Sequence, residues 1–316
     1  FVEPWTFGER ARDWILAHAQ HFDVIHDNQT LADGILDLQQ AGLPVVTTIH
    51  HPISRDLNVA LAGASGWRAR LLVRRWHSFL TMQARVAAQL NHIVTVSRAS
   101  AADIATDFGV LPSAIQVIPN GVDTELFRAL PDVTRKPAQL IATASADAPL
   151  KGLAVLLQAF KLLSADRPAL QLVLIASPKP GGDTEALISQ LQLGDRIHFV
   201  GGVSHADIVR LYAESTVAVV PSLYEGFGLP AVEAMASGIP LVSSDGGALA
   251  EVVGDGGLLV PAGDAKALAE AIDAVLSDAG LAAELINRGQ QRAHRTFSWS
   301  VCARLMVEQY QRCIDL

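Results

Sequence analysis

Two glutamates, Glu225 and Glu233, are carboxylates whose surroundings suggest a bound ligand. They lie in residues 221–238, which read Pro-Ser-Leu-Tyr-Glu-Gly-Phe-Gly-Leu-Pro-Ala-Val-Glu-Ala-Met-Ala-Ser-Gly. Glu233 is flanked by small apolar residues, where a carboxylate is costly to bury unless hydrogen-bond donors accompany it. The hydroxyls of a sugar or a ribose are suitable donors. The pair therefore predicts a site for a polyhydroxylated ligand.

The elements that must position these carboxylates are a strand, a loop and a helix. Residues 215–220 form an apolar, β-branched run that predicts a buried strand. Gly226 and Gly228 allow the loop backbone to approach a ligand closely, and Pro230 suits the first turn of a helix over 231–236. A helix N-terminus that follows a glycine loop leaves unpaired N–H groups, and these attract phosphate.

A Glu-x7-Glu pair taken alone more often consists of a loop residue and a solvated helix residue. This stretch, however, resembles the signature Pro-Ser-x-x-Glu-Gly-Phe-Gly-Leu-Pro-x-x-Glu-Ala-x-Ala-x-Gly-x-Pro and matches every fixed position of it. That signature is typical of the retaining nucleotide-sugar glycosyltransferases of the GT-B fold, the glycogen-synthase-like or glycosyl transferases group 1 family. The resemblance implies an α/β fold with two Rossmann-like domains whose parallel sheets face a cleft. It also implies a nucleoside diphosphate sugar as donor and no separate cofactor.

The resemblance assigns roles to residues of the signature. Glu225 would bind the donor sugar and Glu233 the ribose hydroxyls. The remaining donor-binding positions, which offer backbone N–H groups or line the site, would be Gly226, Phe227, Gly228 and Leu229.

Lys151 follows a predicted strand over 139–144 and precedes a predicted helix, where an ammonium can meet a diphosphate as a point charge. Lys151-Gly152 matches the Lys-Gly that ends this loop in the resembling family. There the lysine stabilises charge on the leaving diphosphate. The family's Gly-Arg at the start of the loop is replaced by Ser145 and Ala146. Either another cation compensates, or Lys151 and the backbone N–H groups after Glu225 suffice.

Two further site residues come from strand ends. His50 and His51 lie at the end of a predicted strand over 45–50, and a histidine pair is by itself more often structural than catalytic. The resemblance implies that His50, rather than His51, touches the donor sugar. It also implies that Val200, near the end of a strand that begins at Ile197, lies against the nucleotide base.

The whole chain sets broader limits. Its 316 residues suit two domains, and a net charge of −8 argues against nucleic acid as the main partner. The two cysteines, Cys302 and Cys313, share roughly one face of a predicted helix, where core packing is favoured over a disulfide or metal site. No Asp or His cluster has metal-ligand spacing, so no metal is expected. The sequence contains no apolar run of membrane-spanning length, and no export signal is expected, so a cytoplasmic location is expected.

The expected division is an N-terminal domain over 1–130, a C-terminal nucleotide-sugar domain over 131–298 and a final helix over 299–316 that returns to the first domain. Members of the resembling family usually begin with a strand and a glycine-rich loop. Here the chain opens on a helix-like stretch, so the N-terminal domain is expected to be partial.

Within a long helical region over 54–89, residues 67–76 carry four arginines bracketed by Trp67 and Trp76. They could lie peripherally on an anionic membrane, at its inner surface, or bind an anionic acceptor. An ordinary solvated helix face is an equal alternative.

The sequence thus predicts transfer of a hexose-type sugar, with retention, to an unidentified glycan, lipid or small-molecule acceptor. Two alternatives remain. One is a sugar-nucleotide epimerase or a phosphorylase on the same scaffold. The other is a fragment that binds nucleotide sugar without turning it over.

Overall fold

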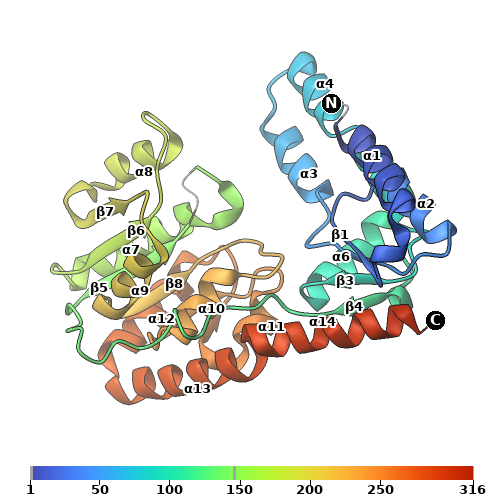
Figure 1. Ribbon diagram of the computed structural model, residues 1–316. Coiled ribbons are helices and arrows are strands. Elements are labelled where there is room, and N and C mark those ends of the chain that lie inside the picture. The colour runs from blue at the N-terminus through green and yellow to red at the C-terminus, as the bar shows by residue number, and fades with distance from the viewer. Residues whose placement is uncertain (1–2, 145–146, 316) are drawn as a thin grey trace. The chain divides into compact units, whose positions relative to one another are not determined.

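The computed structural model describes residues 3–144 and 147–315 (Figure 1). They form two compact units. One comprises the residues through Pro119 together with those from Ala303 onward, and the other comprises Asn120–Cys302. Each unit contains one parallel β-sheet, which confirms the expected α/β class with two parallel sheets.

The first unit has a four-stranded sheet of order β1-β2-β3-β4, all parallel. Its strands are β1 (Ile25–Asn28), β2 (Val45–Thr48), β3 (Ile93–Thr95) and β4 (Ile115–Val117). Its helices are α1 (Glu3–Ala17), α2 (Asp33–Gln40), α3 (Ser54–Gly63), α4 (Trp67–Trp76), α5 (Leu80–Ala87), α6 (Arg98–Phe108) and most of α14 (Trp299–Ile314), with short 3-10 turns at Ala19–His21 and Pro112–Ala114. The single helical region expected over 54–89 is therefore three helices.

Alternation along the strands divides the core of this unit between two faces. Val45 and Ile93 belong to the cluster formed with α2, α5 and α6. Val46 and Val94 point to the opposite face, where Cys313 of α14 packs against them. A parallel sheet must be covered on both sides, and α14 covers the second one. Both cysteines are buried and free, as core packing requires.

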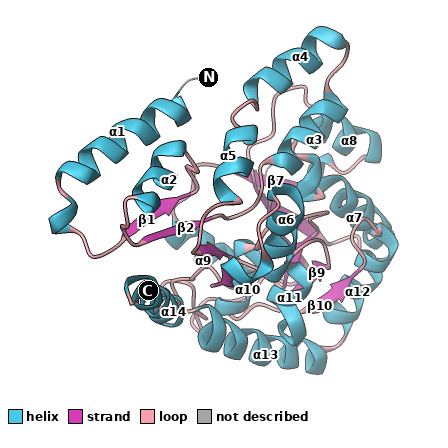
Figure 2. Ribbon diagram, turned by 90° about the vertical axis from the view of Figure 1, so that its right-hand side faces the viewer, coloured by secondary structure: helices cyan, strands magenta, loops and turns pink. Residues whose placement is uncertain are grey.

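The second unit has a six-stranded parallel sheet of order β10-β9-β8-β5-β6-β7. Its strands are β5 (Gln139–Thr143), β6 (Gln171–Ile175), β7 (Ile197–Val200), β8 (Val217–Val220), β9 (Leu241–Ser244) and β10 (Leu258–Val260). Its helices are α7 (Leu153–Asp166), α8 (Asp183–Leu191), α9 (His205–Glu214), α10 (Leu229–Ala236), α11 (Leu249–Val253), α12 (Ala265–Ser277) and α13 (Ala279–Phe297), with 3-10 turns at Pro149–Lys151, Gly194–Arg196 and Gly254–Gly256. Figure 2 shows α12 beside the edge strand β10.

The strand order reverses at β5, because β6 and β7 lie on one side of it and β8, β9 and β10 on the other. Such a reversal opens a crevice at the carboxyl ends of the strands, since the loops on either side lead away from each other. The fold itself therefore places a binding crevice between the loops that follow β5 and β8.

The division between the units differs from the one expected at residues 130 and 131. Val122 N–H donates to the Phe297 carbonyl at 2.7 Å, and the Phe127 ring lies 6.2 Å from that of His205. These contacts attach the segment after Pro119 to the second unit. The second unit also extends to Cys302 rather than 298.

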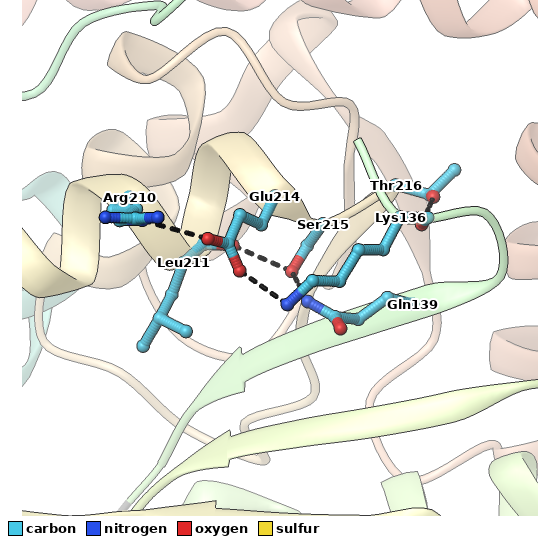
Figure 3. A network of polar contacts seen from close by, with 7 residues as sticks. All are labelled: Lys136, Gln139, Arg210, Leu211, Glu214, Ser215 and Thr216. Atoms are coloured by element: carbon cyan, nitrogen blue, oxygen red, sulfur yellow. Dashed lines mark hydrogen bonds and ion pairs between the residues drawn. The ribbon is translucent and has the colours of Figure 1, made fainter. Parts of the chain in front are cut away.

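A polar network at the amino-terminal ends of β5 and β8 fixes the entry of the chain into this sheet (Figure 3). Glu214 accepts from Lys136 at 2.6 Å and from Arg210 at 3.0 Å, and these partners lower the pKa of its carboxyl. Gln139 donates to Ser215 at 3.0 Å. Both carboxylate oxygens of Glu214 are engaged by protein donors, so we assign the network a structural role.

Candidate functional site

An ion pair lies at the carboxyl ends of β5 and β8. The Nζ of Lys151 is 2.9 Å from Oε1 of Glu225 and 3.1 Å from its Oε2. Ser222 Oγ also donates to Glu225 Oε1, at 2.8 Å. The Glu225 side chain is 11% exposed and that of Lys151 is 37% exposed. The carboxylate is thus fixed in the loop, while the ammonium retains contact with solvent and can meet an anion.

Direct backbone contact between the two loops holds this pair in place. Leu223 N–H donates to the Leu150 carbonyl at 2.8 Å. Gly152 has φ +66°, and a Cβ atom there would lie 1.9 Å from the Pro221 carbonyl oxygen. Only glycine permits both the left-handed conformation and this approach. Gly152 therefore allows the loop that carries Lys151 to approach the loop that carries Glu225.

The loop after β9 closes against the same place. Ala248 N–H donates to the Glu225 carbonyl at 2.9 Å. A Cβ atom at Gly246 would lie 2.5 Å from the Ser222 carbonyl oxygen. The loops after β5, β8 and β9 therefore pack backbone on backbone, which makes the site rigid without large side chains.

The signature loop leads into α10 as the sequence predicts. Gly228 has φ +98°, and a Cβ atom there would lie 2.6 Å from Leu249 Cδ2. Pro230 occupies the first turn. The Phe227 ring is buried and meets the Phe297 ring edge-on, with 5.6 Å between centroids. Its side chain thus stabilises the loop, and Leu229 begins the helix with a partly exposed side chain.

A cavity of about 360 Å³ opens beside the ion pair. It is lined by Thr143 and Ala144 at the end of β5, by Ile175, Ala176 and Ser177 at the end of β6, and by Lys151, Glu225 and Pro230. Val200 is not among these lining residues. It ends β7, where its carbonyl accepts from Ala176 N–H at 3.1 Å. The cavity therefore combines a charged wall with a mainly small and apolar one.

Glu233 lies in α10, behind Pro230. Burial raises the pKa of its carboxyl, and the nearby His205 opposes this shift. In the described residues the carboxylate of Glu233 has no hydrogen bond or ion pair, so it lacks the partners that a desolvated charge requires. Tyr212 is buried close to it, and burial together with the Glu233 charge raises the pKa of that phenol. The Tyr212 hydroxyl contacts Thr143 Oγ1 at 3.3 Å and the Pro230 carbonyl at 3.4 Å.

His50 belongs to the first unit, just after β2. Its Nε2 lies 2.9 Å from Asn28 Oδ1, and its backbone N–H donates to Gln29 Oε1 at 2.7 Å. Burial lowers the pKa of its imidazole, as do the neighbouring His51 and His26. The ring is therefore neutral at neutral pH and can act as both donor and acceptor.

Three residues of the site, Ser222, Tyr212 and Thr143, were not predicted from the sequence. Ser222 is a fixed position of the signature, and its spacing three residues before Glu225 could have suggested the hydrogen bond. Tyr212 and Thr143 carried no such signal, because they meet only through the sheet. Ser145 and Ala146, where the family's arginine is replaced, lie outside the described residues.

Residues 3–144 and 147–315 contain no group of three His, Cys, Asp or Glu side chains placed as metal ligands would be. Likewise, no helix in that part of the chain is both long and apolar enough to cross a membrane.

Comparison with known proteins gives the following matches. Residues 131–292 match the family described as "Glycosyl transferases group 1", and residues 2–126 match "Glycosyltransferase Family 4". The chain is 45% identical to the "MMP alpha-(1->4)-mannosyltransferase" of Mycolicibacterium hassiacum over 99% of this chain and 76% of that protein. It is 30% identical to the "Phosphatidyl-myo-inositol mannosyltransferase" of Mycolicibacterium smegmatis over 92% of this chain and 71% of that protein.

Among solved structures, the sucrose-phosphate synthase of Thermosynechococcus elongatus superposes with a TM-score of 0.77 at 26% identity. The match covers 98% of this chain and 77% of that one. The two parallel sheets thus correspond to those of a glycosyltransferase with the GT-B fold.

Proposed function

Because the chain belongs to the glycosyl transferases group 1 family and is thus a glycosyltransferase, we propose that it transfers a mannosyl group from a nucleoside diphosphate sugar to a hydroxyl of a polyhydroxylated acceptor. The choice of mannose is supported by two relatives whose names specify mannosyl transfer.

The observation that carries this proposal is the Lys151–Glu225 pair on the wall of the cavity. Lys151 presents a cation at the switch point of the sheet, where a diphosphate would meet it and the backbone N–H groups of the following loop. Glu225 holds the ammonium from one side, so its position does not depend on the ligand. The same carboxylate can accept hydrogen bonds from sugar hydroxyls.

Catalysis would depend on charge stabilisation rather than on a protein nucleophile. As the bond from the anomeric carbon to the phosphate oxygen breaks, negative charge develops on the diphosphate, and Lys151 stabilises it. The acceptor oxygen attacks from the same face, and its proton passes to the departing phosphate oxygen, so the anomeric configuration is retained. Because Lys151 supplies the cation, we expect no metal requirement, and turnover in the presence of a chelator tests this expectation.

Glu233 is proposed to bind the ribose. Its carboxylate is desolvated and has no hydrogen-bond or ion-pair partner in the described residues, which makes two vicinal hydroxyls favourable ligands. His50 is proposed to contact the donor sugar, for which its neutral imidazole is suited.

Calorimetric titration with UDP, GDP and ADP, with their mannose and glucose conjugates and with the Glu233→Ala variant tests donor binding. We expect one nucleotide to bind the chain and to bind the variant at least tenfold more weakly. Incubation of that nucleotide's sugar conjugate with a mannoside then tests transfer, because only a transferase yields a new glycoside together with free nucleotide. An altered sugar nucleotide without a glycoside would indicate an epimerase. Phosphate-dependent cleavage of a glycoside would indicate a phosphorylase, and binding without turnover an inactive module.

We further propose that α4 contacts an anionic membrane surface on its cytoplasmic side. None of its residues is buried, and Trp67 is 71% exposed and Leu72 67% exposed. Exposed aromatic and leucine side chains beside four arginines match the composition of interfacial helices. The name of the Mycolicibacterium smegmatis relative refers to a phosphatidyl lipid, which supports the same idea.

A further inference from the structure

The turn after β1 has a backbone conformation that ordinary residues rarely adopt. Gln29 has φ +61° and Leu31 has φ +50°, and neither is a glycine. Asp27, which is largely buried, accepts hydrogen bonds from Thr30 N–H and Leu31 N–H, both at 3.2 Å. Such strain persists only where surrounding contacts impose it, and it is concentrated at functional sites.

What this turn presents is the Gln29 side chain. Its Oε1 accepts from the His50 N–H at 2.7 Å, and its Nε2 donates to the His51 carbonyl at 2.9 Å. The side-chain amide thus pairs with the backbone of the His50-His51 segment just as a neighbouring peptide group would. It continues the pairing of β1 with β2 beyond Asn28 and Thr48, where the strands end.

Gln29 holds the backbone of His50, and Asn28 holds its imidazole ring. His50 Nε2 lies 2.9 Å from Asn28 Oδ1. A carbonyl oxygen only accepts hydrogen bonds, so Nε2 carries the hydrogen and Nδ1 retains its lone pair. Within residues 3–144 and 147–315, Nδ1 has no hydrogen-bond partner. The acceptor nitrogen of a half-buried ring is therefore available to a ligand.

His26 provides an internal contrast. It precedes Asp27 in β1, and both of its ring nitrogens are engaged. Nδ1 lies 2.6 Å from the Tyr310 hydroxyl and Nε2 lies 2.8 Å from Thr48 Oγ1. His26 is thus a structural histidine, whereas within the described residues one nitrogen of His50 is free.

We propose that Asn28 is a positioning residue that holds His50 in the Nε2–H tautomer, so that Nδ1 accepts a hydrogen bond from a hydroxyl of the sugar substrate. The part of the proposal that concerns the sugar rests on the proposed function, whereas the part that concerns the tautomer of His50 does not. It narrows the chemistry, because the sugar group at this position must be a hydrogen-bond donor. A fluorine in place of that hydroxyl cannot donate.

The tautomer is tested without substrate. In the ¹⁵N-labelled chain, ¹⁵N–¹H spectra of the imidazoles near neutral pH, assigned with His50→Gln, should show His50 only as Nε2–H. In Asn28→Ala the second tautomer should become detectable. Asn28→Asp keeps an oxygen acceptor and should keep the wild-type tautomer, which separates this effect from general disruption. Asn91→Ala, at the opposite edge of the same sheet, should change nothing. An Nδ1–H signal from His50 in the wild type, or an unchanged His50 spectrum in Asn28→Ala, would overturn the proposal.

Steady-state kinetics test the consequence. We expect Asn28→Ala to lower kcat/KM about five- to tenfold, as expected when one oriented hydrogen bond is lost, while Asn28→Asp restores part of it and Asn91→Ala is neutral. Mixed tautomers with unchanged kcat/KM would refute the role of Nδ1 as acceptor. A wild-type chain that transfers no sugar would refute the proposed function instead, and the spectra would still decide the tautomer.

Discussion

The carboxyl ends of the two sheets are built in different ways. In the second unit a charged pair, Lys151 and Glu225, stands on loops that approach each other through glycines. In the first unit the corresponding edge presents a neutral histidine held by the amides of Asn28 and Gln29. In the proposed function, the edge with the charged pair binds an anion and the edge with the histidine binds a hydroxyl.

The difference shows where a sequence reveals its site. At the site of the second unit, glycine occupies the left-handed positions Gly152 and Gly228. In the turn that holds His50 in the first unit, the left-handed positions are Gln29 and Leu31, which do not resemble turn residues. A site formed by glycine loops is thus easier to recognise from sequence than one formed by side-chain clamps.

The largest effect on catalysis should come from removing the positive charge of Lys151 in the second unit. Lys151→Met keeps the aliphatic stem but deletes the charge that, in the proposed mechanism, stabilises the leaving diphosphate. We expect kcat to fall about 10²- to 10³-fold, as for loss of one electrostatic contact to a transition state. Initial rates of nucleotide release measure this. The matched control Lys151→Arg keeps the charge and should lose less, whereas equal losses would show that shape rather than charge matters.

The next effect concerns the close approach of the loops. Gly152→Ala would place a Cβ atom 1.9 Å from the Pro221 carbonyl oxygen at φ +66°. We expect a loss of about 3 kcal/mol in the free energy of unfolding, mainly from this clash. The control is Gly202→Ala, which has φ +68° but nothing within 4 Å, and should cost only about 1 kcal/mol. Thermal or urea unfolding compares them, and equal losses would mean that the loops can separate without cost.

How much the sequence predicts follows from the range of each interaction. The loop before α10 and the alternation of strands with helices depend on neighbouring residues, so the signature and the pattern predicted them. The cysteines of α14 likewise follow from helical periodicity. The clamp from Gln29 to His50 joins residues 21 apart in the chain, and Tyr212 meets Thr143 across 69 positions. Such contacts exist only once the sheet has formed, so no local pattern encodes them.

The attachment of residues 120–130 to the second unit was missed for the same reason. The prolines at 131 and 137 suggested a hinge, but the hydrogen bond from Val122 reaches Phe297. The breaks within 54–89 were missed as well, although Gly63 and Gly66 lie at the junction of α3 and α4.

The next prediction concerns the pH dependence of donor binding through Glu233 of the second unit. Burial raises the pKa of Glu233 above its ordinary range. Donor binding that needs the ionised carboxylate should therefore weaken as the pH falls through this raised pKa, at a higher pH than for an ordinary glutamate. The free energy of unfolding of the unliganded chain should change in the opposite direction. The folded state binds this proton more tightly than the unfolded state, so the unliganded chain should become more stable as the pH falls through the same range. Titration calorimetry over about pH 4.5 to 8, with Glu233→Gln as control, checks the binding profile, and urea unfolding over the same range checks the stability. The variant should lose affinity by about tenfold and show a flat profile over this range, while a wild-type profile in the variant would exclude Glu233 as the titrating group.

The smallest effect concerns α4, which belongs to the first unit. Arg74 and Arg75 are exposed and have no ion-pair partner in the described residues, whereas Arg288 of the second unit pairs with Glu284. Each arginine near an anionic surface contributes about 1 kcal/mol, so reversing both charges should lower sedimentation with phosphatidylserine liposomes at least tenfold. Reversal of Arg288 and Arg295 on α13 is the control and should change sedimentation little. High salt should reduce wild-type sedimentation as well, since the attraction is screened. Equal sedimentation of both double variants and the wild type would exclude α4 as a membrane contact and leave it as a solvated helix.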